Sequence, residues 1–425
     1  MKKNVSITDL ISKSNLEHDY DPNAMSVEKA KTWIANFLSP VDQKETIHIK
    51  DALHRIVAES VIAAIHVPNH DNSAMDGYAI NTDTLNGDGP YRLQVTGKIF
   101  AGNQLEGDKK EAVRIMTGAT IPLGLNAVIP QEHVEIHENF ITFKTKPQLN
   151  QNIRRIGEDI QSGQTVFQCG RKLEPCDLGL LASLGIDSIK VYRRIKVAFF
   201  STGDEIISIG NSLSPGQVFD SNRYSLIGLL KSLEVEAIDL GVIPDSKKII
   251  EDTLKEASEM ADVIITTGGV SVGEADYMKE ILKKIGEILF WKISMKPGRP
   301  LAYGKISCCH YFGLPGNPVS TMVTFYQFVR EAILTLSGQT PIPKIPLIKA
   351  KLLSPIKKIP GRTEFQRGIY AQDDEGIFKV SPLKDQGSGI LRSMSEANCF
   401  IVLHEHMTHL EKDTWVDIQL FDSLF

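Results

Sequence analysis

The stretch that decides the central fold is Val263-Ile264-Ile265-Thr266-Thr267-Gly268-Gly269-Val270-Ser271-Val272-Gly273-Glu274-Ala275-Asp276. Its first residues are β-branched, which predicts a buried strand that runs directly into a glycine-rich loop. A helix is expected over residues 277–285. Gly268 and Gly269 carry no side chain, so a phosphate could approach the backbone there. The loop matches neither the dinucleotide fingerprint nor the Walker A pattern, and it indicates only an anion site after a strand.

Two similar units precede this stretch. Residues 197–200 form an apolar strand that leads into Ser201-Thr202-Gly203-Asp204-Glu205, and a helix is expected over 223–233, with Asp220, Ser221 and Asn222 as cap candidates. Another strand ends near Val242 and is followed by a charged amphipathic helix over 246–260. Repeated strand, loop and helix predict a doubly wound, parallel or mixed α/β domain over residues 194–343. Binding sites in such sheets lie beyond the carboxyl ends of the strands.

Carboxylates follow three of these strands. Glu205 and Asp245 follow the first two, and Glu274 and Asp276 end the glycine-rich loop. Carboxylates beside a phosphate repel it unless a cation lies between them, so Mg²⁺ is the expected bridge. The alternative is that these residues only form turns or favour the positive end of a helix.

Basic residues come next in the chain. Lys292, Lys296 and Arg299 surround a rigid Pro-Gly-Arg-Pro segment and could neutralise phosphate or another oxyanion. A solvated charged face is the alternative. The segment Gly313-Leu314-Pro315-Gly316-Asn317-Pro318-Val319-Ser320 begins a long helix that is expected to reach about Leu336. Asn317 and Pro318 suit a helix start, and an oxyanion resting on that first turn is the functional alternative.

The remaining segments predict β-rich domains around this α/β domain. Residues 1–24 are expected to be a loose extension, followed by a helix over 26–38 that Ser26 can cap. Residues 25–68 and 157–193 are expected to form a linking domain that contains a short helix over 178–184. Short alternating strands predict a β-rich domain over 69–156 and a C-terminal β-barrel over 344–425.

Composition limits the class of protein. A chain of 425 residues with a net charge of −5 predicts several domains and argues against a nucleic-acid binder. Five cysteines without a Cys-x-x-Cys pair indicate reduced thiols. No signal peptide or membrane-spanning run is evident, so a cytoplasmic protein is expected. His404, His406 and His409 suggest a metal site, but no partner with matching spacing accompanies them.

Seven motifs occur in a fixed order. They are Asp-Asn-Ser-Ala-Met-Asp-Gly-Tyr-Ala at 71–79, Arg-Ile-Met-Thr-Gly at 114–118, Asn-Ile-Arg-Arg-Ile-Gly-Glu-Asp at 152–159, Ser-Thr-Gly-Asp-Glu at 201–205, Gly-Gly-Val-Ser-Val-Gly-Glu-Ala-Asp-Tyr at 268–277, Lys-Pro-Gly-Arg-Pro at 296–300 and Gly-Leu-Pro-Gly-Asn-Pro-Val-Ser at 313–320. On these motifs the chain, from about residue 25 to its end, closely resembles the molybdopterin molybdenumtransferases, the family that includes the gephyrin E domain.

The resemblance implies a transferase. Such an enzyme takes adenylylated molybdopterin and molybdate, releases AMP with Mg²⁺ and inserts molybdenum, which completes the molybdenum cofactor. It also implies a homodimer of elongated, four-domain subunits, in which the 69–156 segment of one subunit faces the α/β domain of the other. Molybdopterin adenylyltransferase and molybdoenzyme maturation proteins are candidate partners; nucleic acid and membrane are not.

The resemblance also assigns roles to residues. The positions expected around the metal and adenylate are Glu205, Asp245 and Asp276. The positions expected to hold molybdate or pterin are Lys292, Lys296 and Ser388, and Pro315 and Pro318 shape the same pocket. Beside the resemblance, the loop and the basic segment add the substrate-binding candidates Gly268, Gly269, Ser271 and Arg299. The contribution expected from the facing subunit is Asp76, Thr117, Arg154 and Asp159, with the two aspartates counted as catalytic. The alternatives are a molybdopterin adenylyltransferase, which would not need the β-rich segments, and a gephyrin-like scaffold.

Overall fold

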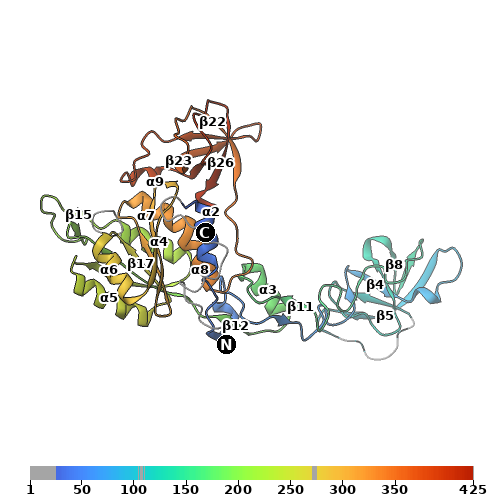
Figure 1. The fold of residues 1–425 in the computed structure, drawn as a ribbon. Helices are drawn as coiled ribbons and strands as arrows, with labels where there is room; N and C mark the ends of the chain where they lie inside the picture. Colours follow the sequence, from blue (N-terminus) through green and yellow to red (C-terminus); the bar gives the residue numbers. More distant parts are fainter. Residues whose placement is uncertain (1–24, 104, 106–108, 110, 270–274, 425) are drawn as a thin grey trace. The chain divides into compact units, whose positions relative to one another are not determined.

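The computed structural model describes residues 25–103, 105, 109, 111–269 and 275–424 (Figure 1). Contacts divide the chain into two compact units, residues 1–45 with 192–425 and residues 46–191. The finer domain boundaries expected from the sequence stay predictions.

The first unit contains a six-stranded mixed sheet. Its strand order is β16 (Glu236–Ile243), β13 (Lys196–Thr202), β17 (Val263–Thr267), β21 (Cys309–Leu314), β20 (Pro300–Ile306) and β18 (Glu287–Lys292). The first four strands run parallel, whereas β20 and β18 pair antiparallel. The expected α/β domain is confirmed, and the sequence did not show which strands would form its antiparallel edge.

Helices cover both faces of this sheet because its central strands are apolar on both sides. On β13, Val197 and Phe199 pack in one cluster with α2 (Val27–Ala35) and α4 (Asn222–Ser232). Ala198 and Phe200 pack in a second cluster with α5 (Lys247–Met260) and α6 (Ala275–Ile285). Figure 1 shows α5 and α6 on one side of β17 and α4 and α7 on the other.

The long helix expected up to Leu336 is confirmed but is interrupted. It consists of α7 (Pro318–Thr324), a π-helical turn (Phe325–Val329) and α8 (Arg330–Leu336). The buried Thr324 hydroxyl donates to the carbonyls of Ser320 and Thr321 just before the wide turn. The turn presents Gln327, whose amide donates to Gln419 of the C-terminal domain at 3.0 Å. Hydrophobic periodicity alone does not report such a turn, because the apolar face continues through it.

The C-terminal segment forms a closed five-stranded barrel, as expected. Its strands are β22 (Ile348–Leu352), β23 (Thr363–Gln372), β24 (Phe378–Pro382), β25 (Cys399–Leu403) and β26 (Trp415–Leu420). Neighbouring strands pair in the order β23-β24-β22-β26-β25. The first and last of these, β23 and β25, also pair with each other, which closes the barrel. A short strand outside the barrel, β19 (Met295–Lys296), pairs parallel with β23. The barrel and the α/β domain are thereby joined by backbone hydrogen bonds.

The second unit is β-rich, as expected. Its main sheet has the order β7 (Ala127–Pro130), β4 (Gly77–Ile80), β6 (Ala112–Ile115), β5 (Tyr91–Ile99), β9 (Phe140–Phe143) and β8 (Glu135–His137). Two-stranded sheets join β3 (Asn72–Ser73) to β10 (Ile153–Arg154), β2 (Val61–Ile62) to β11 (Thr165–Phe167), and β1 (Lys44–His48) to β12 (Ser188–Tyr192). The short helix α3 (Pro175–Ser183) begins three residues before the position expected.

All five cysteines lie in the described residues and none forms a disulfide, as their number and spacing predicted. Cys309 and Cys399 are buried, and burial raises the pKa of Cys399 to about 12, which suits packing rather than reactivity. Within the described ranges, no helix combines the length and apolar character needed to cross a bilayer.

Asp177 offers a test of how the second unit is stabilised. Its buried carboxylate accepts hydrogen bonds from Arg171 Nε at 3.0 Å, Arg171 Nη2 at 2.7 Å and the backbone N–H of Glu174 at 2.9 Å. Burial opposes ionisation, but the hydrogen bonds outweigh it and hold the pKa of Asp177 below its usual value. We expect Asp177→Asn to lower the local stability of α3 by about 1–3 kcal/mol at pH 7. Amide hydrogen exchange of α3 measures this loss.

The pH dependence of that loss has a defined sign. Because the folded pKa is lowered, the carboxylate stabilises the unit above its unfolded pKa of about 3.9, and this stabilisation disappears as the pH falls through the folded value. The difference between wild type and Asp177→Asn should therefore be full at pH 7 and shrink below about pH 4. Asp88→Asn, at an exposed position of the same unit, is the control. An equal difference at both pH values would contradict this account.

Candidate active site

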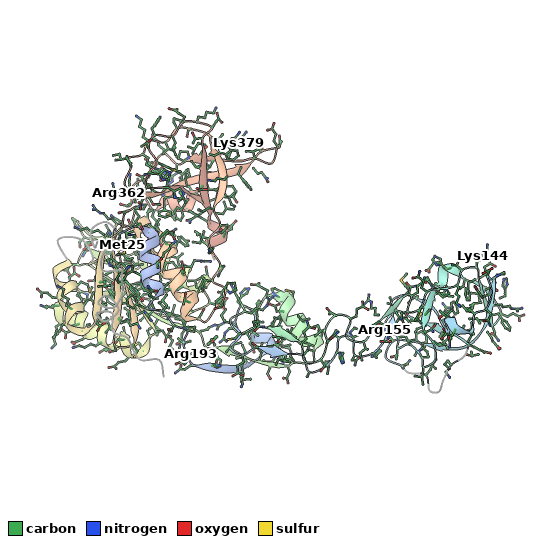
Figure 2. All side chains as sticks on the ribbon, turned by 45° about the vertical axis from the view of Figure 1, so that its right-hand side comes forward. Met25, Lys144, Arg155, Arg193, Arg362 and Lys379 are labelled. Atoms are coloured by element: carbon green, nitrogen blue, oxygen red, sulfur yellow. The ribbon has the colours of Figure 1, made fainter. Side chains whose placement is uncertain are left out.

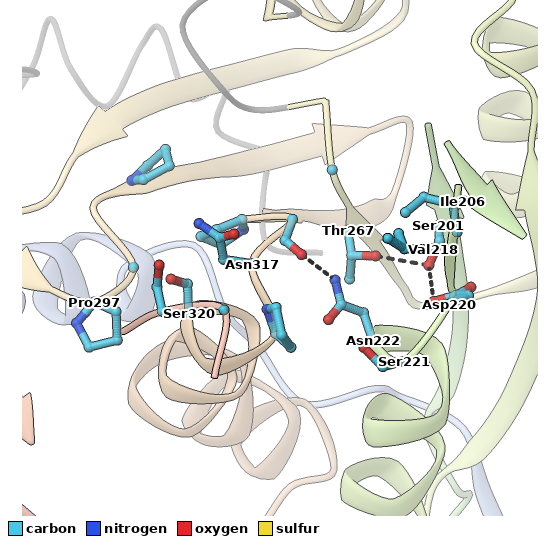
Figure 3. Close-up of a pocket in the computed structure, with 18 of the residues that line it drawn as sticks. Ser201, Ile206, Val218, Asp220, Ser221, Asn222, Thr267, Pro297, Asn317 and Ser320 are labelled. Atoms are coloured by element: carbon cyan, nitrogen blue, oxygen red, sulfur yellow. Dashed lines mark hydrogen bonds between the residues drawn. The ribbon is translucent and has the colours of Figure 1, made fainter. Parts of the chain in front are cut away.

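A cavity of about 830 Å³ opens at the carboxyl ends of β13, β17 and β21 (Figure 3). The segments of the α/β domain that line it are the end of β13, residues 205–206 and 218–219, the start of α4, the loop after β17, and the turn before α7 with the start of that helix. Lys296 to Pro300 and residues 386–389 of the C-terminal domain complete the lining. The cavity therefore lies at the edge where parallel α/β sheets bind ligands.

Many of the residues selected from the sequence lie in this cavity. Those that line it are Glu205, Gly268, Gly269, Lys296, Arg299, Pro315, Pro318 and Ser388. Asp245 is next to it, because Thr202 lines the cavity and donates its hydroxyl hydrogen bond to Asp245 Oδ1. Lys292 ends β18 opposite Pro300 and is not among the lining residues described. Ser271 and the side chain of Asp276 lie outside the described part of the chain.

The strand ends meet at Gly268. This residue has φ +92°, and a Cβ built on it would lie 2.6 Å from the carbonyl oxygen of Thr202. Any side chain would both strain the backbone and collide with β13. The glycine therefore allows the loop after β17 to lie directly against the end of β13.

Sequence reasoning missed a polar network of buried residues in the lining of the cavity. Ser201 Oγ donates to Asp220 Oδ1 at 3.0 Å and lies 2.9 Å from Thr267 Oγ1, as Figure 3 shows. Asp220 Oδ1 also accepts the backbone N–H of Arg223 at 3.1 Å and so caps the start of α4. The sequence identified Asp220 only as a cap candidate; an acidic residue between an apolar strand and a helix was the available signal.

Asn222 was also considered only as a cap candidate. Its Nδ2 donates to the carbonyl oxygen of Gly316 at 2.6 Å, and the side chain is largely buried. The start of α4 is thereby tied to the turn before α7, and both segments line the cavity (Figure 3). The contact joins residues 94 positions apart, which no local pattern can report.

One wall of the cavity is apolar. Strands β14 (Ile206–Ile207) and β15 (Val218–Phe219) pair parallel, and Ile206, Val218 and Phe219 line the cavity. Val218 and Phe219 keep 51% and 45% of their surface exposed. In Figure 3, Ile206 and Val218 lie at one end of the view, and Pro297 and Ser320 lie at the other. The cavity thus combines an apolar wall with a region that carries Lys296 and Arg299.

A separate polar cluster lies in the second unit. Asp76 Oδ1 accepts the backbone N–H of Thr117 at 2.8 Å and its hydroxyl at 2.9 Å. The backbone hydrogen bond, followed by the hydroxyl, lowers the pKa of Asp76, so this carboxylate stays ionised. The structure thereby brings together two of the residues that the resemblance assigns to the facing subunit.

The other two residues of that set are exposed on the same unit. Arg154 lies in β10 opposite Asn72, and Asp159 follows in a turn, where its backbone N–H donates to Val67. The neighbouring Arg155, labelled in Figure 2, pairs with Asp71 at 2.8 Å and helps to hold this segment.

The carboxylates near the cavity are chemically suited to Mg²⁺. Hard divalent cations prefer carboxylate and hydroxyl oxygens, which Glu205, Asp245 and Thr202 offer. The Glu205 carboxylate lies beside Gly203, since a Cβ built there would be 2.8 Å from Oε2. Among the residues described, no group of three His, Cys, Asp or Glu side chains could hold a metal ion. The side chain of Asp276, the third expected ligand, is not among the residues described.

The three C-terminal histidines have other contacts. His404 Nε2 lies 3.0 Å from Asp417 Oδ2, and its ring stacks on His406 with centroids 6.1 Å apart. His409 Nε2 lies 3.0 Å from Glu411 Oε1. Among the described residues, these histidines do not gather with other His, Cys, Asp or Glu side chains into a group that could hold a metal ion.

Comparison with known proteins covers most of the chain. Residues 25–185 match the family model "MoeA N-terminal region (domain I and II)", residues 205–335 match "Probable molybdopterin binding domain", and residues 349–421 match "MoeA C-terminal region (domain IV)". Molybdopterin molybdenumtransferase from Haemophilus influenzae is 45% identical over 403 residues, which cover 94% of this chain and 99% of that protein.

Two further proteins are similar to this chain over most of its length. Gephyrin from Dictyostelium discoideum is 34% identical, over 88% of this chain and 59% of its own length. The crystal structure of the molybdopterin biosynthesis moeA protein from Pyrococcus horikoshii OT3 matches with a TM-score of 0.81 and 29% identity, over 94% of this chain and 100% of that chain. Since near full-length relatives exceed 30% identity and all three regions match in order, the chain belongs to the molybdopterin molybdenumtransferase family.

Proposed function

We propose that this protein transfers molybdenum from molybdate to molybdopterin, the activity named for its relatives. The observation that carries the proposal is the composition of the cavity, where the exposed cations Lys296 and Arg299 share one lining with Ser388 and the backbone of Gly268. Cations and hydroxyls bind an oxyanion, and a glycine loop admits a phosphate. A cavity of about 830 Å³ has room for a nucleotide-sized substrate.

The proposed substrate is adenylylated molybdopterin, from which AMP is released. In this scheme, Lys296 and Arg299 neutralise the oxyanion, and the Thr202 hydroxyl orients the Asp245 carboxylate. Glu205, Asp245 and Asp276 would hold Mg²⁺, which supplies charge neutralisation to phosphate oxygens when bound. Hydrolysis at phosphorus needs little else from the protein than such positioning and an oriented water.

The apolar wall suits the planar part of the same substrate. Ile206, Val218 and Phe219 offer partly exposed hydrophobic surface that a heterocyclic ring could cover. A ligand with a flat ring at one end and an anionic group at the other matches both regions of the cavity.

The proposal includes a homodimer in a cytoplasmic location. Asp76, Thr117, Arg154 and Asp159 would then act on the substrate of the facing subunit, as the family resemblance implies. Molybdopterin adenylyltransferase and molybdoenzyme maturation proteins are the proposed neighbours in the pathway. The preformed Asp76–Thr117 contact supports a defined role for that pair.

The activity itself is the first test. Purified protein incubated with adenylylated molybdopterin should release AMP only when both Mg²⁺ and molybdate are present, because both the phosphate and the oxyanion site must be filled. Chromatography of the nucleotide products measures this release. Absence of AMP under these conditions would overturn the proposal, and ATP-dependent adenylylation of molybdopterin as the main activity would identify the adenylyltransferase instead.

Loss of the proposed metal ligands is the second test. Asp245→Asn and Asp276→Ala should each lower turnover by about 100- to 1000-fold, since charge stabilisation of the transition state is removed. Circular dichroism should be unchanged, because Asp245 follows the end of β16 and Asp276 lies at the start of α6. Asp252→Asn, at an exposed position on α5, is the matched control and should keep wild-type turnover. Normal turnover of either site variant would refute the assignment of that residue.

A further inference from the structure

A buried carboxylate in the C-terminal barrel has no role in the mechanism described above. Glu364 lies near the start of β23, and only 6% of its side chain is exposed. Burying an ionised carboxylate is unfavourable unless it is paired and hydrogen-bonded. Its partners therefore indicate why a charge is retained at this position.

The contacts of Glu364 lead to the cavity. Its Oε2 lies 3.7 Å from Nζ of Lys296 and accepts a hydrogen bond from Gln366 Nε2 at 2.9 Å. Lys296 lines the cavity, and 51% of its side chain is exposed. One end of this ion pair is thus buried in the barrel, and the other end is open to a ligand.

Backbone pairing fixes the two residues side by side. In the parallel ladder of β19 with β23, Lys296 is opposite Glu364 and Met295 is opposite Thr363. The Thr363 N–H also donates to the Ser294 carbonyl oxygen at 2.9 Å. Figure 2 shows Arg362, the residue before this strand, on the part of the barrel that lies next to the α/β domain. The ion pair therefore bridges two domains at a position that backbone hydrogen bonds determine.

A second buried cation near Glu364 is already engaged. The Lys358 ammonium donates to the carbonyl oxygens of Ile359 at 3.2 Å, Met407 at 3.2 Å and Glu405 at 3.5 Å. An ammonium has three donors, so these contacts use them all. The ion pair that the structure gives Glu364 is with Lys296 instead.

We propose that Glu364 is a positioning residue, which holds the Lys296 ammonium at the cavity wall so that the C-terminal barrel sets the affinity of the site for molybdate. The inference rests on the proposed function and deepens it. An unrestrained lysine loses much rotamer freedom when it binds an anion. The buried carboxylate limits that freedom beforehand and leaves the ammonium facing both Glu364 and the incoming oxyanion.

A double-mutant cycle tests this role. Glu364→Gln keeps the shape and a hydrogen-bonding group but removes the charge. It should raise KM for molybdate by about 3- to 10-fold, the size expected when one ordered side chain is released, with kcat within about 2-fold of wild type. In a Lys296→Ala background, the same change should have no further effect on KM. Titration calorimetry of the full chain with molybdate gives the corresponding change in Kd.

Two further variants separate the effect of the Glu364 position from a general loss of charge and from a loss of folding. Glu375→Gln removes one exposed carboxylate from the same barrel and should leave KM unchanged. Glu364→Asp keeps the charge but withdraws it from Lys296, so it should also raise KM, and it replaces the glutamine variant if that protein does not fold. An unchanged or lower KM in Glu364→Gln, or an equal effect without Lys296, would overturn the inference.

A structural readout keeps this test independent of the proposed function. Crystal structures of wild type and Glu364→Gln should show the Lys296 ammonium ordered beside residue 364 only in the wild type. A wild-type crystal structure with the Lys296 ammonium ordered away from Glu364 would contradict the inference, irrespective of the activity of the enzyme. Absence of molybdate-dependent AMP release in wild type, with Lys296 ordered beside Glu364, would instead count against the proposed function alone.

Discussion

The close approach of two backbones, at the ends of β13 and β17, is the constraint on which the site depends. Gly268 lies so near the carbonyl of Thr202 that no side chain fits between them. Pairing of the same two strands puts Ser201 opposite Thr267, and the Ser201 hydroxyl connects this pair to Asp220 just before α4. Thr202 lies at the same edge of the sheet, and its hydroxyl donates a hydrogen bond to the Asp245 carboxylate. A side chain at position 268 would disturb the cavity and the polar network in its lining together.

Two domains line the cavity, and backbone pairing of β19 with β23 of the barrel joins them. The α/β domain supplies the strand ends and the glycine loop, and the barrel supplies residues 386–389 and the strand that pairs with β19. The Val319 N–H donates to the Ser388 carbonyl oxygen at 3.0 Å, so the start of α7 is held by the barrel as well. Because backbone hydrogen bonds join the domains, the positions of Lys296 and Ser388 in the site are linked.

Local patterns predicted the elements well where the pattern extends over several residues. The β-branched run at β17, the amphipathic run at α5 and the Ser26 cap of α2 all correspond to elements in the structure. The π-helical turn after Thr324 was not predicted, because it leaves the apolar face intact. The antiparallel edge formed by β18 and β20 was not predicted either, since strand direction depends on long-range pairing.

The sequence by itself determined the family, the strand-loop-helix order and a group of candidate residues, because motifs and periodicity are local properties. It selected Glu205, Gly268 and Lys296, all of which line one cavity. Only the tertiary structure decided that Asn222 would hold the turn at Gly316 and that Glu364 would lie beside Lys296. These contacts join residues far apart in the chain, and such proximity depends on how sheets and domains pack rather than on any nearby residue.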